Sequence, residues 1–422
     1  MNGIIRQGKV IDATGEVTIK DIYFKDGCFA EPYEGPFDVD LDAAGKIVMP
    51  GFVDAHCHLR DPGFEYREDI VTGTRSAAHG GFTSIACMPN TKPVCDNAAV
   101  VSYIVKKSQT EGYVNVFPIG AVSKQLQGKE LAEIGLMKEA GIVAVSDDGA
   151  PVRTADMMRK GMVYARDFDL VVINHCEDPS LADGYMNEGY NSTQMGVLGV
   201  PSAAEDIMVA RDLILAEYLD LPIHLAHIST HGAVDMIRRA KKRGVKVTCE
   251  TCPHYFVLTD DACLGFNTYA RVNPPLRRPE DVTAIIEGLR DGTIDMIATD
   301  HAPHHEDEKD VPFDQANNGF IGFETAFALG YTYLVQPGYL TLAELVEKMS
   351  SAPANLLKIG RGTLEVGRPA DLTIADVEET WEVDRFQMAS KSMNTPYHGM
   401  TLTGKIKATL VDGKVVFNDE LC

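Results

Sequence analysis

The sequence predicts an α/β protein built as a (β/α)8 TIM barrel with a small β-sandwich domain formed from both termini. Its 422 residues exceed one ordinary domain but suit a barrel of roughly 250 residues with an added module. The middle of the chain alternates apolar strand-like segments with amphipathic helical ones, which is typical of a parallel sheet with crossover helices. Both ends instead consist of short strand-like segments and turns. These three features together favour a barrel flanked by a composite β domain.

The two ends of the chain have the same sequence pattern. Residues 1–45 contain short apolar strands with glycine and aspartate at the breaks, and the part after Arg361 looks the same, with a predicted hairpin turn at Asp412-Gly413. We therefore expect residues 1–50 and 361–422 to form one small β domain, and residues 51–360 to form the barrel.

The barrel prediction depends on eight apolar segments that read as strands. They are residues 47–59, 82–90, 114–123, 142–149, 170–178, 223–230, 245–256 and 294–304. Helical stretches lie between them, with expected N-caps at Asp96 and Thr154 and an expected capping box of Ser202 with Glu205. An open doubly wound sheet would need a glycine-rich phosphate turn after its first strand, and this sequence has none.

Composition narrows the class of protein. The net charge of −22 argues against nucleic acid as a partner and favours a small-molecule substrate. No apolar run reaches the roughly 18 residues of a membrane span, and the N-terminus does not have the layout of a signal peptide. The nine cysteines suggest free thiols, and the Cys249-x-x-Cys252 pair is expected to be packing rather than a metal site. We expect a soluble cytoplasmic protein without membrane or nucleic-acid partners.

Polar residues gather at the ends of the predicted strands. The first barrel strand delivers His56 and His58, which lie two residues apart, so their imidazoles point the same way and can converge on one ion. A lone histidine of this kind would more often be a satisfied core residue. Because the carboxyl ends of barrel strands form one face, the other strand-end residues should meet these two there. They are Arg60, Asn90, Asp147, Asp148, His175, Glu177, His227, Asp300 and His304.

This set of side chains predicts a metal centre. Four imidazoles, those of His56, His58, His175 and His227, together with two carboxylates, can hold two Zn²⁺ ions with one carboxylate between them. Two metals about 3.5–4 Å apart can acidify a bridging water and polarise a carbonyl at the same time. The predicted chemistry is metal-assisted hydrolysis of an amide-like bond. The residues alone leave both Asp147 and Asp148 open as the bridging ligand.

Several longer motifs resemble a known family over nearly the whole chain. PGFVDAHCHLRDPG, GFTSIACMPNT, SDDG, NHCED, HIST and TDHAPH, with GRPADLTIAD and NTPYHG near the end, are similar to the amidohydrolase superfamily. More narrowly, they resemble the dihydroorotases of the single-chain bacterial type. HxH and TDHAPH are common to many amidohydrolases, whereas their combination with RDPG, MPNT and DDG is more specific.

The resemblance implies roles for individual residues. It makes His56, His58 and Asp300 ligands of one metal and His175 and His227 ligands of the other. The family spacing to the histidine of the fifth strand favours Asp148 over Asp147 as the bridge. The implied substrate residues are Arg60, Asn90, Asn273, His304 and the backbone around Asn318 and Gly319. The chain departs from its relatives at Asn317-Asn318-Gly319, where they tend to carry Pro-Phe-Gly.

The resemblance also implies a reaction. A dihydroorotase closes N-carbamoyl-L-aspartate into L-dihydroorotate, reversibly and with release of water, in de novo pyrimidine synthesis. In the hydrolytic direction a bridging hydroxide attacks the ring carbonyl, and Asp300 passes its proton to the departing nitrogen. Arg60 offers a planar fork suited to the substrate carboxylate. The family resemblance also admits a homodimer and an association with aspartate transcarbamoylase.

Other interpretations compete with this one. A hydantoinase or allantoinase would use the same metals on another cyclic ureide, but those related to this chain bridge their metals with a carbamylated lysine. A catalytically dead paralogue that supports aspartate transcarbamoylase should have lost ligands. Glu177 is expected to orient a neighbouring group, and His231 and His254 to lie behind the site or on the surface. Residues 304–319 read either as a lid or as a solvated loop.

Overall fold

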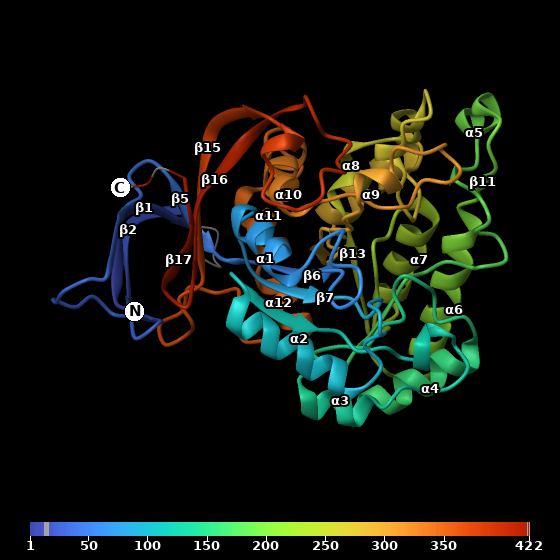
Figure 1. Cartoon of the computed structure of the whole chain (residues 1–422), viewed down its shortest axis with the longest axis horizontal. Coiled ribbons are helices and arrows are strands. Elements are labelled where there is room, and N and C mark those ends of the chain that lie inside the picture. Colours follow the sequence, from blue (N-terminus) through green and yellow to red (C-terminus); the bar gives the residue numbers. More distant parts are fainter. Residues whose placement is uncertain (12–16, 420, 422) are drawn as a thin grey trace.

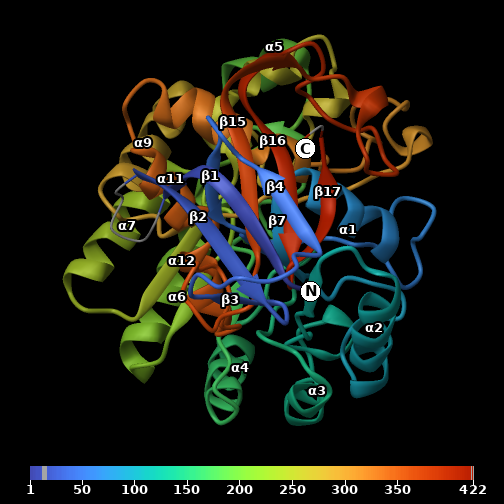
Figure 2. The same cartoon turned by 90° about the vertical axis from the view of Figure 1, so that its left-hand side faces the viewer.

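The computed structural model describes residues 1–11, 17–419 and 421 (Figure 1). Both ends of the chain pair in one sheet, of order β17-β16-β15-β5-β1-β2-β3, with β4 beside β1. Figure 2 shows this sheet in front of the rest of the molecule. Its strands are β1 (Gly3–Ile11), β2 (Val17–Lys25), β3 (Cys28–Ala30), β4 (Val39–Asp42), β5 (Ile47–Pro50), β15 (Leu372–Glu382), β16 (Thr401–Val411) and β17 (Lys414–Asn418).

Strand β5 joins the two ends, because it pairs with β1 on one side and with β15 on the other. Apolar side chains of N-terminal and C-terminal strands then share one core, which includes Phe24, Val48 and Leu410. At the predicted hairpin, Asp412 and Gly413 link β16 to β17 with φ of 48° and 74°, as a two-residue type I′ turn requires. Residues 12–16, which belong to the first predicted stretch of strands and turns, lie outside the described residues.

The middle of the chain is a closed parallel barrel, as predicted. Seven of its strands are β6 (Phe52–Cys57), β7 (Phe82–Cys87), β8 (Asn115–Pro118), β9 (Val172–Asn174), β12 (Ile223–Leu225), β13 (Val247–Thr251) and β14 (Met296–Ile297). The fourth position is filled by the stretch around Val145, which makes parallel bridges to Gly120 and to Val172. A parallel bridge between Cys57 and His301 closes the ring.

Helices surround the barrel (Figure 1). They are α1 (Ile70–His79), α2 (Ala98–Glu111), α3 (Ile134–Ala140), α4 (Ala155–Arg166), α5 (Tyr190–Met195), α6 (Ala203–Leu219), α7 (His231–Lys242), α8 (Pro253–Val257), α9 (Pro279–Arg290), α10 (Phe323–Gly330), α11 (Leu342–Met349) and α12 (Ser351–Leu357). The largest apolar cluster packs strand residues such as Ile85, Val172 and Ile223 against these helices. Within the described ranges, none of the helices is long and apolar enough to cross a bilayer.

Short elements complete the chain. β10 (Met186–Asn187) and β11 (Gly199–Val200) form a small parallel pair outside the barrel. The 3-10 turns are η1 (Lys124–Leu126), η2 (Asp260–Cys263), η3 (Thr268–Ala270), η4 (Glu306–Glu308) and η6 (Arg385–Gln387), and η5 (Tyr331–Val335) is a π-helical turn.

The first predicted strand, residues 47–59, is two strands in different sheets. β5 belongs to the composite sheet, whereas β6 begins the barrel, and only Gly51 separates them. The apolar pattern runs through both strands because both are fully buried, so periodicity alone does not reveal the change of sheet. This change supports our proposal that the first part of the composite domain ends at residue 50. The proposed second part, residues 361–422, contains β15, β16 and β17.

Two of the three expected helix caps are wrong. Asn97, not Asp96, caps α2 by accepting from the amides of Ala99 and Val100, while Asp96 accepts from the amide of Gln125. Ser202 makes no side-chain cap at α6. Its expected partner Glu205 instead accepts from the backbone amides of Ser229 and Thr230 at 2.9 and 3.1 Å, beyond the end of β12. Thr154 caps α4 as expected, accepting from the amide of Met157.

Candidate metal and active site

Six buried side chains meet at the carboxyl ends of the barrel strands. They are His56 and His58 from β6, Asp148 after the stretch around Val145, His175 after β9, His227 after β12 and Asp300 after β14. The structure thus brings together all six residues predicted as metal ligands. They lie on the face that carries the active site in TIM-barrel enzymes.

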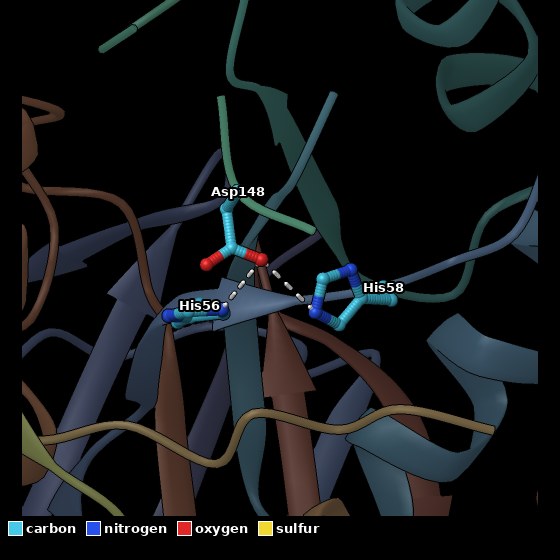
Figure 3. A group of neighbouring side chains, drawn as sticks. All are labelled: His56, His58 and Asp148. Atoms are coloured by element: carbon cyan, nitrogen blue, oxygen red, sulfur yellow. Dashed lines mark ion pairs between the residues drawn. The ribbon is translucent and has the colours of Figure 1, made fainter. Parts of the chain in front are cut away.

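The first cluster is formed by His56, His58 and Asp148 (Figure 3). Oδ2 of Asp148 lies 3.4 Å from Nε2 of His56 and 3.5 Å from Nε2 of His58. Asp300 approaches from the other strand end, with Oδ1 at 3.1 Å from Nε2 of His58 and 3.5 Å from Nε2 of His56. Two imidazoles and two carboxylates therefore face one point.

The second cluster shares Asp148 with the first and adds His175 and His227. Oδ1 of Asp148 lies 3.5 Å from Nε2 of His227 and 3.7 Å from Nδ1 of His175. The two imidazole nitrogens are themselves only 2.8 Å apart. Because its two oxygens face different clusters, Asp148 lies between two candidate metal sites.

Asp147 points away from these clusters. Its Oδ1 accepts from the amide of Ser123 at 2.9 Å and its Oδ2 from the hydroxyl of the same residue at 2.5 Å. Both of its oxygens are therefore used in holding the loop after β8. The geometry selects Asp148 over Asp147, a choice that the residues alone had left open.

The donor set fits a metal. Nε2 of His56 and Oδ1 of Asp148 are buried, and neither has a hydrogen-bond partner among the described residues. Buried polar atoms are rarely left unpaired, and one ion in each cluster would satisfy both atoms. Imidazole nitrogen and carboxylate oxygen are ligands suited to zinc.

The electrostatics keep the two carboxylates charged. Burial favours the neutral acid, but the imidazoles around Asp148, His56 foremost, hold the pKa of that carboxyl well below its usual range. For Asp300, burial is likewise outweighed by the hydrogen bond to His58 and by the neighbouring imidazoles, so its pKa is also lowered. Ionised carboxylates are what a metal centre needs from these positions.

A buried carboxylate that the sequence analysis missed holds His56 in place. Oε1 of Glu250 lies 2.7 Å from Nδ1 of His56, and Oε2 lies 3.2 Å from Nε2 of His224, whose Nδ1 contacts Thr248. Burial opposes ionisation of Glu250, yet its bonds to His224 and His56 lower its pKa to about 2. A glutamate inside the apolar strand VTCET was the available signal, because buried charges need partners.

Three residues of the site have strained backbones. Arg60, His227 and Asp300 adopt φ of 63°, 32° and 47°, a region that side-chain-bearing residues rarely occupy. Each costs on the order of 1–3 kcal/mol, and such strain persists where the surrounding structure enforces it, often at functional sites. The strain therefore accords with a role for these strand ends in function.

One wall of the site lies beside the two His/Asp clusters. It is formed by the side chains of Arg60 and His304 and by the backbone of Asn318 and Gly319. Nε of Arg60 donates to the carbonyl of Pro303 at 3.1 Å, and Nη2 lies 3.3 Å from Nε2 of His304. Nε2 of His304 also lies 2.7 Å from the carbonyl oxygen of Asn318. Burial lowers the pKa of His304 to about 3, so its ring is neutral at pH 7.

The two predicted substrate asparagines contact ligand histidines. Oδ1 of Asn90 lies 2.9 Å from Nδ1 of His58, and Nδ2 of Asn273 lies 3.4 Å from Nε2 of His175. Glu177 also faces His175, with Oε2 at 3.3 Å from Nε2, in the orienting position expected for it. These contacts fix the rings so that Nε2 of His58 and Nδ1 of His175 face Asp148.

The residues that the sequence analysis set aside lie elsewhere. His231 pairs with Asp281 at 2.9 Å, and more than half of its side chain is exposed. His254 is buried, with its ring against Tyr255 and Phe320. Cys249 and Cys252 are buried free thiols and belong to neither ligand cluster of the described residues.

Comparison with known proteins decides the family. Residues 45–233 match a family model described as dihydro-orotase-like. A dihydroorotase of Acetivibrio thermocellus is 60% identical over 426 residues and covers 99% of both chains. A dihydroorotase of Trichlorobacter lovleyi is 52% identical and covers 99% of this chain and 100% of its own. The chain belongs to the dihydroorotase family.

Solved structures extend the likeness of this dihydroorotase-family chain to other enzymes. The L-hydantoinase (dihydropyrimidinase) from Arthrobacter aurescens has a TM-score of 0.90 and 28% identity, covering 100% of this chain and 97% of its own. The dihydropyrimidinase from Brevibacillus agri has a TM-score of 0.87 at 22% identity, which shows a common fold alone. The predicted fold class is confirmed by these neighbours together with the barrel and the composite sheet.

Proposed function

We propose that this chain is a zinc-dependent dihydroorotase, which interconverts N-carbamoyl-L-aspartate and L-dihydroorotate in pyrimidine synthesis. The observation that carries the proposal is the shared position of Asp148 between two imidazole clusters, beside a wall that contains Arg60. A carboxylate between two metal positions suits hydrolysis of a cyclic amide, and a guanidinium beside them suits a substrate that carries a carboxylate. The full-length dihydroorotase relatives support the same substrate.

We assign the ligands as follows. His56, His58 and Asp300 would hold one zinc ion, His175 and His227 a second, and Asp148 would bridge the two. When bound, two such ions would supply an acidified water and polarise the ring carbonyl. Nε2 of His56 and Oδ1 of Asp148, which lack hydrogen-bond partners within the described ranges, support this assignment.

Asp300 is the proposed proton carrier. In hydrolysis the water oxygen bonds to the ring carbonyl carbon, the carbon–nitrogen bond breaks, and Asp300 passes the water's proton to the departing nitrogen. In the reverse direction Asp300 takes the proton from the ureido nitrogen as the ring closes, and water leaves. The lowered pKa of Asp300 means that its carboxylate is ionised, as the hydrolytic direction requires.

The remaining residues would hold the substrate. Arg60 would form paired hydrogen bonds to the carboxylate of dihydroorotate. Asn90, Asn273 and His304 would add polar contacts, together with the backbone at Asn318 and Gly319. Since Arg60 and His304 already lie 3.3 Å apart, one carboxylate can reach both side chains.

Location and assembly belong to the same proposal. A cytoplasmic small-molecule enzyme accords with the charge of −22 and with buried free cysteines. A homodimer and an association with aspartate transcarbamoylase are partners that the family resemblance suggests.

The decisive experiment is a substrate panel with metal analysis. The purified protein should hydrolyse L-dihydroorotate and form it from N-carbamoyl-L-aspartate, with far slower turnover of hydantoin and allantoin. Neither of these carries the carboxylate that Arg60 would bind, so both forfeit that interaction. Preferential turnover of hydantoin would assign the chain to the hydantoinase activity of its structural neighbours, and no turnover in a zinc-loaded sample would support a non-catalytic role.

A further inference from the structure

The segment between β15 and β16 leaves the composite sheet and packs on the barrel. Figure 1 shows this part of the chain, in red, running from the strands toward α8. It is fastened by two carboxylates of the barrel: the partly buried Glu324 accepts from the amides of Ala389 and Ser390 at 3.0 and 3.2 Å, and the buried Glu68 binds the hydroxyl of Ser390. These bonds fix the segment just before it reaches Asn394.

Asn394 is 2% exposed and uses its polar groups on the walls of the site. Its Oδ1 accepts from the amide of His304 at 3.1 Å. Its Nδ2 donates to the carbonyls of Ala302 and Gly319 at 3.2 and 3.1 Å. Its own carbonyl accepts from the amide of Ile321 at 2.9 Å. Asn394 thus links the stretch after β14 to the stretch around residue 319.

Both tied stretches carry proposed substrate groups. Nε2 of His304 lies 2.7 Å from the carbonyl oxygen of Asn318 and 3.3 Å from Nη2 of Arg60, the proposed partner of the substrate carboxylate. Gly319 adopts φ of 116°, and a Cβ there would lie 2.6 Å from Cβ of Ala302, so the two stretches are as close as their backbones permit. A shift of either stretch would therefore move substrate contacts.

We propose that Asn394, from the far end of the sequence, is a positioning residue that sets the substrate wall of His304 and Gly319. This inference rests on the proposed function, which assigns that wall to substrate binding. Among the described residues, the hydrogen bonds of Asn394 reach no side chain of the proposed metal ligands, so it acts on substrate recognition and not on the metal centre. The composite domain thereby supplies a part of the active site that the barrel lacks by itself.

Removing the side chain should loosen the wall. In Asn394→Ala the amide of His304 and two carbonyls lose their partners in a buried place, and such groups are costly to leave unpaired. Asn394→Asp keeps the size of the side chain and an acceptor for His304 but turns a donor into an acceptor opposite two carbonyls. Ser392→Ala is the matched control, because Ser392 lies on the same segment and its hydroxyl donates to the carbonyl of Arg67 and not directly to any residue of the described stretch 302–321.

The kinetic test combines Asn394→Ala with His304→Ala. We expect Asn394→Ala and Asn394→Asp each to raise KM for dihydroorotate about 10-fold. Their zinc content and kcat should stay near the wild-type values, and Ser392→Ala should resemble the wild type. If Asn394 acts through His304, the double variant should have nearly the KM of His304→Ala. Additive effects on KM, or lost zinc in both Asn394 variants, would overturn the inference.

A second measurement does not depend on catalysis. Hydrogen–deuterium exchange of peptides covering residues 302–321 should rise in Asn394→Ala and in Asn394→Asp but not in Ser392→Ala. Unchanged exchange in this region would overturn the positioning role. If His304→Ala itself left KM unchanged, the proposed substrate role of His304 would fail, and the exchange result would decide the positioning role alone.

Discussion

Two aspartates of the barrel show how position sets the chemistry of a side chain. Asp54, on β6, accepts from the amide and hydroxyl of Thr299 at 2.9 and 2.5 Å, and burial raises its pKa to about 7. Asp300 lies one residue beyond Thr299, but among imidazoles, and its pKa is lowered. The two environments therefore separate the pKa values of the two carboxyl groups, and the imidazoles keep Asp300 in the ionised state in which a carboxylate can accept a proton. Asp54 instead orients the turn that carries Asp300.

Asp300→Asn should separate proton transfer from metal binding. The amide cannot accept a proton, so kcat should fall by about 10²–10⁴-fold, while four histidines and Asp148 retain zinc. The unprotonated carboxylate is needed for hydrolysis, so the wild-type rate should rise with pH through the pKa of Asp300, which lies in the acid range. The variant should lose this limb. pH profiles with zinc measured on the same samples test this, and near-normal rates with the limb intact would remove Asp300 from the role.

Arg60→Lys should weaken substrate binding without affecting the metal. A lysine ammonium cannot reproduce the planar fork of a guanidinium, so KM for N-carbamoyl-L-aspartate should rise by about 10-fold or more. Zinc content should remain at the wild-type level, because the described contacts of Arg60 are to Pro303 and His304. An unchanged KM would mean that another residue holds the carboxylate.

Glu250→Gln should lower the affinity of the site for zinc, because Glu250 holds the ring of His56 in place. An amide can accept from only one of His56 and His224, and its NH2 group would face the nitrogen of the other ring. Loss of such a partner typically lowers metal affinity about 10–100-fold. Zinc competition with a chromophoric chelator measures the affinity. Glu324→Gln is the matched control, because Glu324 is a partly buried carboxylate bonded to Ser76 and to the backbone of Ala389 and Ser390. Equal losses in both variants would contradict a specific role for Glu250.

The segment 304–319 has many exposed residues, but buried side chains anchor it to the protein. Lys309 is fully buried, and its Nζ donates to the carbonyls of Thr268, Arg271 and Asn317 at 3.2, 3.3 and 2.6 Å. Phe313 and Ala316 are also buried. Charged residues in a helix-poor stretch favour exposure in the sequence, but here the lysine finds backbone acceptors inside the protein. The segment is anchored beside His304.

Lys309→Met should loosen this anchor. Methionine fills a similar volume but leaves three carbonyls without their donor, which should lower the free energy of unfolding by about 1–3 kcal/mol. Urea unfolding measures the loss, and limited proteolysis should show faster cleavage within residues 304–319. Lys160→Met is the control, because Lys160 is half exposed and pairs with Asp156 on α4. Equal stability and equal cleavage of the two variants would show that Lys309 does not anchor the segment.

At the scale of the whole molecule, the site unites strand ends from all around the barrel. Proposed ligands that lie 244 positions apart, such as His56 and Asp300, meet only once the barrel is closed. Metal ions that bind the folded site but not the unfolded chain shift the folding equilibrium toward the folded state. Metal content, activity and thermal stability are therefore linked.

Removal of metal should affect the entire protein. A strong chelator should abolish turnover and lower Tm by on the order of 5 °C, because the stabilising free energy of binding is lost. Added zinc should restore both. Calorimetry with elemental analysis on the same sample measures the two effects together. Full activity in a sample shown to be free of metal would contradict the proposed chemistry.

The sequence by itself determined the barrel, the participation of both termini in the β-rich domain and the six candidate ligands. The reason is local: a His-x-His pair points one way on a strand, and parallel strands end on one face. In the sequence, only the family spacing distinguished Asp148 from Asp147 as the bridging ligand. In the structure, the bonds of Asp147 to Ser123 show that Asp147 points away from the clusters.

Tertiary structure alone decided the partners of buried polar groups. Glu205 turns from the expected cap to the loop after β12, Glu250 finds His56, and Asn394 finds His304 across 90 positions. The same holds for the division of residues 47–59 between two sheets. Sequence patterns record burial and periodicity, but which distant donor meets a buried acceptor depends on the packing of the complete fold, because every such group must find a partner there.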